Sequence, residues 1–150
     1  MDIQDIDKMP AGEELDALVA ENVMGGKWIR FHDADYPDPD TEDGRVHATI
    51  VLPKDFDFLC PPEYVEDTGE CPRTRYSWIP RYSTDIAAAW EVIDKLDELY
   101  SAWFEIRGPR VWLAQCHLPN YKQFSATGVA SAPLAICRAA LKAIKGDNDE

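Results

Sequence analysis

Apolar side chains recur every three or four residues between Ser83 and Leu99, and this spacing predicts an amphipathic helix. Ser83 or Thr84 is the expected cap of its first turn, where Asp85 also suits the positive end of the helix dipole. The predicted buried face consists of Ile86, Ala89, Trp90, Ile93 and Leu96. We expect the remaining elements to pack around this helix.

The same spacing predicts two further helices, one near each end of the chain. The first runs from Glu13 to Met24, with acidic residues in its first turn and Gly25-Gly26 as its stop signal. The second runs from Ala132 to Lys145, with Ser131 as its cap and Gly146 as its end. Its predicted apolar face is Leu134, Cys137, Ala140, Leu141 and Ile144, so we expect Cys137 to be a core thiol and not a nucleophile.

The sequence predicts short strands in two parts of the chain. An early strand is expected from the apolar run at Trp28–Phe31, and another from the alternation of apolar and polar positions at Val46–Leu52. A later hairpin is expected from Tyr100–Arg107 and Val111–His117, which a Gly-Pro turn separates. Leu118–Gly128 contains Pro119, Asn120 and Gly128, and we expect a polar connection there.

These elements predict one α+β domain with an antiparallel sheet flanked by helices, an α/β/α sandwich-like arrangement. The chain of 150 residues suits a single domain, which we place at residues 13–146. Residues 1–12 are expected to form a flexible lead-in, and residues 147–150 a charged tail. Proline-rich, irregular inserts are expected at residues 33–44 and 53–72.

The chain is strongly acidic, with a formal net charge of -13. Such a chain repels phosphate at long range, so we expect no direct binding to nucleic acid or to anionic membranes. No segment approaches the roughly 18 apolar residues of a membrane span. The N-terminus also lacks the basic and then apolar pattern of a signal peptide, so a cytoplasmic location is expected.

Cysteines and acidic loops offer no metal site. None of the 4 cysteines forms a Cys-x-x-Cys pair, and free thiols are expected in the cytoplasm. Cys60 and Cys71 would form a disulfide only in an exported protein. Cys116 and His117 are adjacent, and neighbours rarely ligate one tetrahedral zinc ion. The acidic loop at residues 33–44 does not fit the calcium-loop spacing, so we predict no metal and no cofactor.

One basic and aromatic segment, residues 73–82, runs directly into the helix that begins near Ser83. One arginine guanidinium binds two phosphate oxygens at once, and aromatic rings stack on bases. The free N–H groups at the start of a helix favour an anion. A second helix start at Ser131 would approach the first if the two helices lie side by side, which brings in Arg138. The predicted ligand-binding residues are Arg73, Arg75, Tyr76, Trp78, Arg81, Tyr82, Ser83, Thr84, Asp85 and Arg138.

An alternative interpretation of this segment assigns it no ligand. The arginines would then neutralise nearby acids, and the aromatic rings would fill the core. Asp85 favours this alternative, because its carboxylate would repel a phosphate unless it turned aside or bound a ribose hydroxyl.

Motifs for catalysis are weak in this sequence. There is no Gly-x-Ser-x-Gly, no His-x-x-x-His and no glycine-rich phosphate loop. His47-Ala48-Thr49 matches half of a two-histidine phosphodiesterase pattern, but His117-Leu118-Pro119 lacks the hydroxyl residue. We therefore predict no catalytic residue, and a hydrolase that uses His47 and His117 stays an alternative.

Three segments together resemble a known family: Leu15–Gly25, Tyr82–Trp90 and Ala132–Leu141. In their residues and in their order along the chain, these segments are similar to the phage ABA sandwich domain proteins, which are small phage and prophage proteins. The resemblance covers about 30 residues directly and implies helices flanking an antiparallel sheet. It implies no catalytic motif, and the inserts at 33–44 and 53–72 depart from shorter members.

Small phage proteins often counter host defences, some by sequestering nucleotide signals, and this class analogy shapes the functional expectation. We expect a phage-encoded, non-enzymatic protein that sequesters a small phosphorylated or nucleotide-derived molecule, such as a host immune signal. It would act as an anti-defence sponge in the cytoplasm of the infected bacterial cell, as a homo-oligomer. The alternatives are an acidic interaction module that inhibits a host protein and a nucleotide-cleaving hydrolase.

Overall fold

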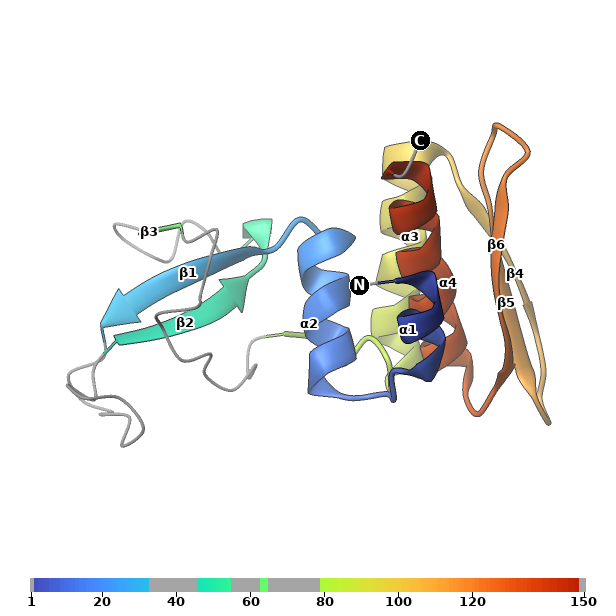
Figure 1. Cartoon of the computed structure of the whole chain (residues 1–150), viewed down its shortest axis with the longest axis horizontal. Coiled ribbons are helices and arrows are strands. Elements are labelled where there is room, and N and C mark those ends of the chain that lie inside the picture. Colours follow the sequence, from blue (N-terminus) through green and yellow to red (C-terminus); the bar gives the residue numbers. More distant parts are fainter. Residues whose placement is uncertain (1, 33–45, 55–62, 65–78, 149–150) are drawn as a thin grey trace. The chain divides into compact units, whose positions relative to one another are not determined.

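The computed structural model describes residues 2–32, 46–54, 63–64 and 79–148. These residues belong to two compact units, one of Met1–Met24 with Pro80–Glu150 and one of Gly25–Ile79, and each is described by itself (Figure 1). Helices and antiparallel sheets make up the described residues, which confirms the α+β fold class.

The unit of Gly25–Ile79 contains a three-stranded antiparallel sheet. Its strands are β1 (Lys27–His32), β2 (Val46–Val51) and β3 (Glu63–Tyr64), in the order β2-β1-β3. Trp28 lies opposite Ile50 in the register of β1 and β2. This pairing confirms the early strands. The inserts expected at 33–44 and 53–72 fall almost entirely outside the described residues.

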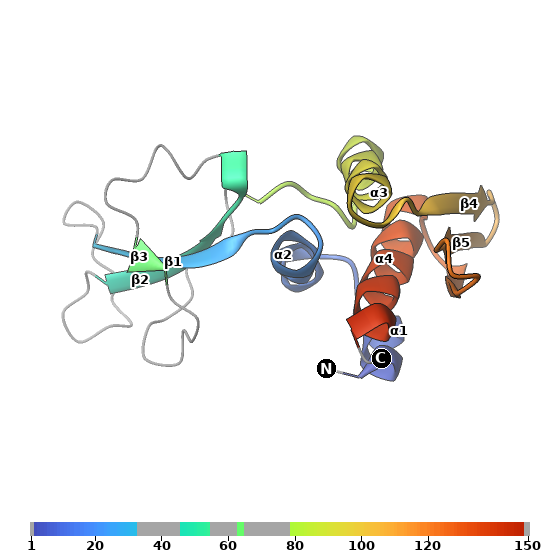
Figure 2. The ribbon, with the colours of Figure 1, turned by 90° about the horizontal axis from the view of Figure 1, so that it is seen from above.

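The larger unit has one helix at its centre. Its helices are α1 (Ile3–Lys8), α2 (Glu13–Asn22), α3 (Ile86–Tyr100) and α4 (Ala132–Asn148). Its sheet contains β4 (Trp103–Arg107), β5 (Trp112–His117) and β6 (Gln123–Val129), antiparallel in the order β4-β5-β6. α4 contacts this sheet on one side and the other three helices elsewhere (Figures 1 and 2).

α4 is buried on almost its whole circumference, and not on one face as its periodicity predicts. From Ala132 to Ile144 every side chain except Arg138 is buried. The alanines of this stretch let neighbouring backbones approach closely from several directions. Cys137 is fully buried, which confirms the prediction of a core thiol.

The two ends of α4 differ in how well the sequence predicts them. Ser131 caps the start as expected, because its Oγ accepts a hydrogen bond from the N–H of Leu134 at 3.4 Å. Gly146 was expected to end the helix, and this is wrong because α4 continues to Asn148. A Cβ at Gly146 would overlap the ring of Phe124, so this glycine makes room for a neighbour.

The expected polar connection at 118–128 is wrong over much of its length, because β6 occupies Gln123–Val129 and pairs with β5. Ala126 and Val129 are buried in this strand. Polar and apolar residues alternate from Gln123 to Thr127, but Phe124 is the only large apolar side chain among them, so the strand signal is weak.

The residues assigned to a flexible lead-in contain α1. A helix of six residues is too short to be stable alone, so tertiary contacts hold it. Ile6 is buried, the carboxylate of Asp7 pairs with Nζ of Lys142, and the carbonyl of Met9 accepts a hydrogen bond from Nη2 of Arg138 at 2.7 Å.

Candidate ligand-binding site

α3 turns a different face to the core from the one that its periodicity predicts. Its buried side chains are Ala88, Ala89, Val92 and Leu96. Ile86 is 46% exposed and Trp90 is 52% exposed, so placing both in the core was wrong. Alanine side chains allow α3 to approach α4 closely, and this turns the larger apolar residues of α3 away from the core.

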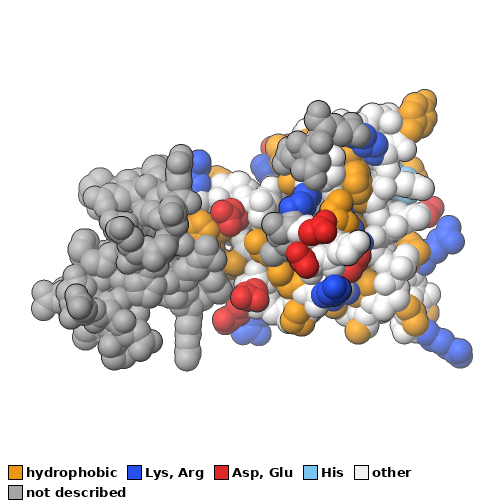
Figure 3. Space-filling view, viewed as in Figure 1, with side chains coloured by type: hydrophobic (Ala, Val, Ile, Leu, Met, Phe, Trp, Pro, Cys, Tyr) orange, Lys and Arg blue, Asp and Glu red, His pale blue; other side chains and the backbone are white. Residues whose placement is uncertain are grey.

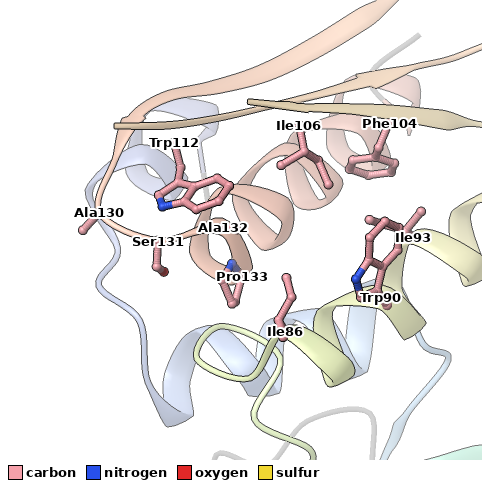
Figure 4. Close-up of a pocket in the computed structure, with 10 residues that line it drawn as sticks. All are labelled: Ile86, Trp90, Ile93, Phe104, Ile106, Trp112, Ala130, Ser131, Ala132 and Pro133. Atoms are coloured by element: carbon pink, nitrogen blue, oxygen red, sulfur yellow. The ribbon is translucent and has the colours of Figure 1, made fainter. Parts of the chain in front are cut away.

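These displaced apolar residues line a cavity of about 730 Å³ in the larger unit (Figure 4). α3 contributes Ile86, Trp90 and Ile93 to its wall. The sheet contributes Phe104 and Ile106 from β4 and Trp112 from β5, and residues 130–133 close the cavity beside the start of α4. The volume lies within the roughly 300–1,000 Å³ that is usual for small-molecule sites.

The starts of two helices border this cavity. Ile86 is the first residue of α3, and Ala132 and Pro133 are the first two of α4. The sequence predicts a joint site only if these two helix starts lie close together. Both starts already have caps, because Asp85 accepts a hydrogen bond from Ala87 at 3.0 Å and Ser131 accepts one from Leu134.

Trp112 is held in place by a close approach of the chain. A Cβ at Gly108 would overlap the indole ring of Trp112, so the absence of a side chain at Gly108 makes room for the ring. Figure 4 shows Trp112 near Ser131 and Trp90 beside Ile93, with the two indoles at different ends of the cavity. Two aromatic rings therefore form separate walls of one open cavity.

The lining is apolar, and none of its ten described residues has an ionisable side chain. Its polar side-chain groups are the indole N–H groups of Trp90 and Trp112 and the hydroxyl of Ser131. Neither indole N–H donates a hydrogen bond to any residue that the structure describes. The cavity therefore offers hydrogen-bond donors in an apolar surface.

The structure describes only some of the ligand-binding residues that the sequence predicts. Arg73, Arg75, Tyr76 and Trp78 are outside the described residues. Arg81 and Thr84 are exposed, and Asp85 is the cap of α3. Among the predicted residues that the structure describes, none is part of the cavity wall, and the role of all ten in binding stays a prediction.

Tyr82 and Ser83 precede α3 in the chain, and both are fully buried. The N–H of Ser83 donates to Oδ1 of Asp16 at 2.7 Å, and its Oγ accepts from the N–H of Gly12 at 2.9 Å. Burial raises the pKa of the Asp16 carboxyl, although its hydrogen bonds with Ser83 oppose the shift. The hydroxyl of Tyr82 has no partner among the described residues, and burial raises its pKa.

Arg138 faces α1 and not the cavity. Its Nη2 donates to the carbonyl of Met9, while its buried Nε has no hydrogen-bond partner within the described part of the chain. Arg138 lies more than one turn into α4, and its guanidinium is bonded to Met9 and not to the helix start at Ser131.

His117 stacks on Trp103, with ring centroids 3.8 Å apart and planes 6° from parallel. Its Nε2 is buried and has no partner among the described residues. The side chain of His47 lies outside what the structure describes, so the two-histidine hydrolase is not tested. The described residues contain no group of three or more His, Cys, Asp or Glu side chains that would hold a metal ion.

The sequence reasoning missed Phe104, Ile106 and Trp112 as wall residues. Their signal was the alternation of the predicted hairpin, which places Phe104 and Ile106 on one face. That signal shows that a face is apolar, but it does not show whether another element covers it.

The chain belongs to the phage ABA sandwich domain family, which it matches over residues 17–141. This confirms the predicted family and identifies a phage protein. Comparisons with curated proteins and with solved structures gave no match. Among the described helices, none combines the length and the apolar character that a membrane span requires.

Proposed function

We propose that this protein is a phage-encoded, non-enzymatic binding protein that captures a small nucleotide-derived molecule. The observation that carries the proposal is the cavity of about 730 Å³ in which two tryptophan rings and two helix starts border the same space. Aromatic rings bind bases by stacking, and concave apolar sites with a few polar groups are typical of small-molecule binding.

Capture is favoured over catalysis by the chemistry of the cavity wall. General acid–base and nucleophilic catalysis need a titratable or nucleophilic side chain within reach of the ligand. Among the described lining residues, the hydroxyl of Ser131 is the only such group, and none of the others would act as its base. A ligand held here would leave unchanged.

Sequestration of a host immune signal would give such a protein its role. Membership of a phage family supports action in the cytoplasm of the infected cell, where a sponge would lower the free concentration of a signalling nucleotide. Homo-oligomerisation would raise the number of sites in each particle.

The test incubates the purified protein with a panel of cyclic nucleotides and ADP-ribose-type molecules, then removes the protein by filtration. We expect one class to disappear from the filtrate and to return with unchanged mass after the protein is heated. Trp90→Ala should abolish this depletion, whereas Trp103→Ala, which alters an exposed tryptophan outside the cavity wall, should not. A cleaved product would identify the hydrolase, and no depletion would reject the proposal.

A second candidate is an acidic module that inhibits a host protein, which the net charge of -13 favours. Figure 3 shows acidic, basic and apolar side chains interspersed on one face of the larger unit, so the acids there form no single patch. Salt-sensitive capture of a basic host protein would support this candidate, and its absence at low salt would count against it.

A further inference from the structure

We infer that the cavity recognises the uncharged, acceptor-bearing heteroaromatic ring of its ligand, and that the phosphates of the ligand stay outside it. This inference rests on the proposed function, because it assigns a part of the ligand to the cavity. It states that the ring of the ligand, and not its phosphates, supplies the affinity for the cavity.

Charge is the first reason to exclude phosphate from the cavity. None of the wall side chains that the structure describes is cationic, so none of them would replace the water that a phosphate loses. The carboxylate of Asp85 directly precedes the wall residue Ile86 and adds negative charge on that side. A phosphate is therefore better placed in solvent.

The helix starts do not compensate for the missing cations. The N–H of Ala87 is bonded to Asp85, and the N–H of Leu134 is directed at Ser131. Pro133 has no N–H at all. The two starts thus retain fewer free donors than an anion-binding helix end presents.

The hydrogen-bonding side chains of the wall select for acceptors. The indole N–H groups of Trp90 and Trp112 are donors only. The Oγ of Ser131 already accepts from Leu134, which leaves its hydroxyl hydrogen free to donate. A ring with imine nitrogens or carbonyl oxygens complements such donors, and nucleobases have this chemistry.

The shape of the wall selects for a flat ring. Indole faces favour stacked or edge-to-face contacts with another aromatic ring. The ring of Trp112 packs closely against Gly108, whereas the side chain of Trp90 is 52% exposed. A planar ligand group would enter past Trp90 and cover it.

The experiment measures binding of four nucleosides and of their 5′-mono- and diphosphates by titration calorimetry. For the base that binds, we expect the three dissociation constants to agree within about threefold and to change little between low and high salt. If the nucleotides bind and the nucleoside does not, ligand capture survives and the ring inference is overturned. If no nucleoside or nucleotide binds, both proposals fall.

Two conservative variants test the donors directly. Trp90→Phe and Trp112→Phe keep an aromatic ring and remove the N–H, so each should weaken binding about tenfold, as expected for one lost hydrogen bond. Trp103→Phe is the matched control and should bind as the parent does, since Trp103 stacks on His117 away from the cavity wall. Unchanged binding in both cavity variants would overturn the assignment.

Trp90→Phe also guards against a loss of folding, because the parent side chain is half exposed. Without ligand, the thermal unfolding temperature of Trp90→Phe should match that of the parent. Weakened binding in a variant of unchanged stability then reports on the donor alone.

Discussion

The backbone N–H of Ser83 donates a hydrogen bond of 2.7 Å to Oδ1 of Asp16, and this bond joins the turn before α3 to α2. The two residues are 67 positions apart in the sequence, and both are buried. Since α3 begins three residues after Ser83, this bond helps to fix the end of α3 that borders the cavity.

Replacing Asp16 by alanine should lower the free energy of unfolding by about 1–3 kcal/mol, because it leaves the buried N–H of Ser83 without an acceptor. Asp16→Asn keeps a carbonyl oxygen in place and should lose less. Urea unfolding of both variants measures the difference. Equal stability of Asp16→Ala and the parent would mean that the hydrogen bond contributes nothing.

Asp16 should also give the stability an unusual pH dependence. Burial raises its pKa above 3.8 in the folded state, so the folded protein binds this proton more tightly than the unfolded chain does. The contribution of Asp16 to the free energy of unfolding therefore rises as the pH falls through the folded-state pKa toward 3.8. This sign is opposite to that of an acid in a salt bridge.

Subtracting the unfolding free energy of Asp16→Asn from that of the parent removes the effect of the other acids. We expect this difference to increase from pH 7 to pH 4 in urea titrations at fixed temperature. A difference that stays level or decreases would contradict a raised pKa at Asp16.

Gly146→Ala should destabilise the protein although alanine favours helices. A Cβ at this position overlaps the ring of Phe124, and such overpacking costs about 1–3 kcal/mol, against a gain of about 1 kcal/mol in helix propensity. Denaturant unfolding measures the net change. In the background of Phe124→Leu the same substitution should cost less, and an unchanged cost would exclude the ring as the cause.

Cys116 and Cys137 should resist thiol reagents in the folded protein. Both side chains are fully buried, and burial raises the pKa of Cys116 to about 12 and also raises that of Cys137. In a Cys60→Ser, Cys71→Ser background, we expect no rapid reaction with an aromatic disulfide reagent at pH 8. Both thiols should react at once in denaturant, and rapid labelling without denaturant would show that β5 at Cys116 or α4 at Cys137 is accessible.

Local pattern was enough to predict most elements of the fold. The spacing in α2, α3 and α4, the alternation in β2 and β4 and the apolar runs in β1 and β5 are visible in the sequence. β6 escaped because Phe124 is its only large apolar residue before Val129, and α1 escaped because its stability comes from contacts with α4.

The sequence by itself determined that α3 is an amphipathic helix, that Cys137 lies in the core, and that the chain belongs to an α+β phage family. Only the tertiary structure decided which side of α3 faces α4, and therefore that Ile86 and Trp90 border a cavity. Periodicity identifies the apolar side chains of a helix, but the close packing of its alanines against a neighbour decides which of them are covered.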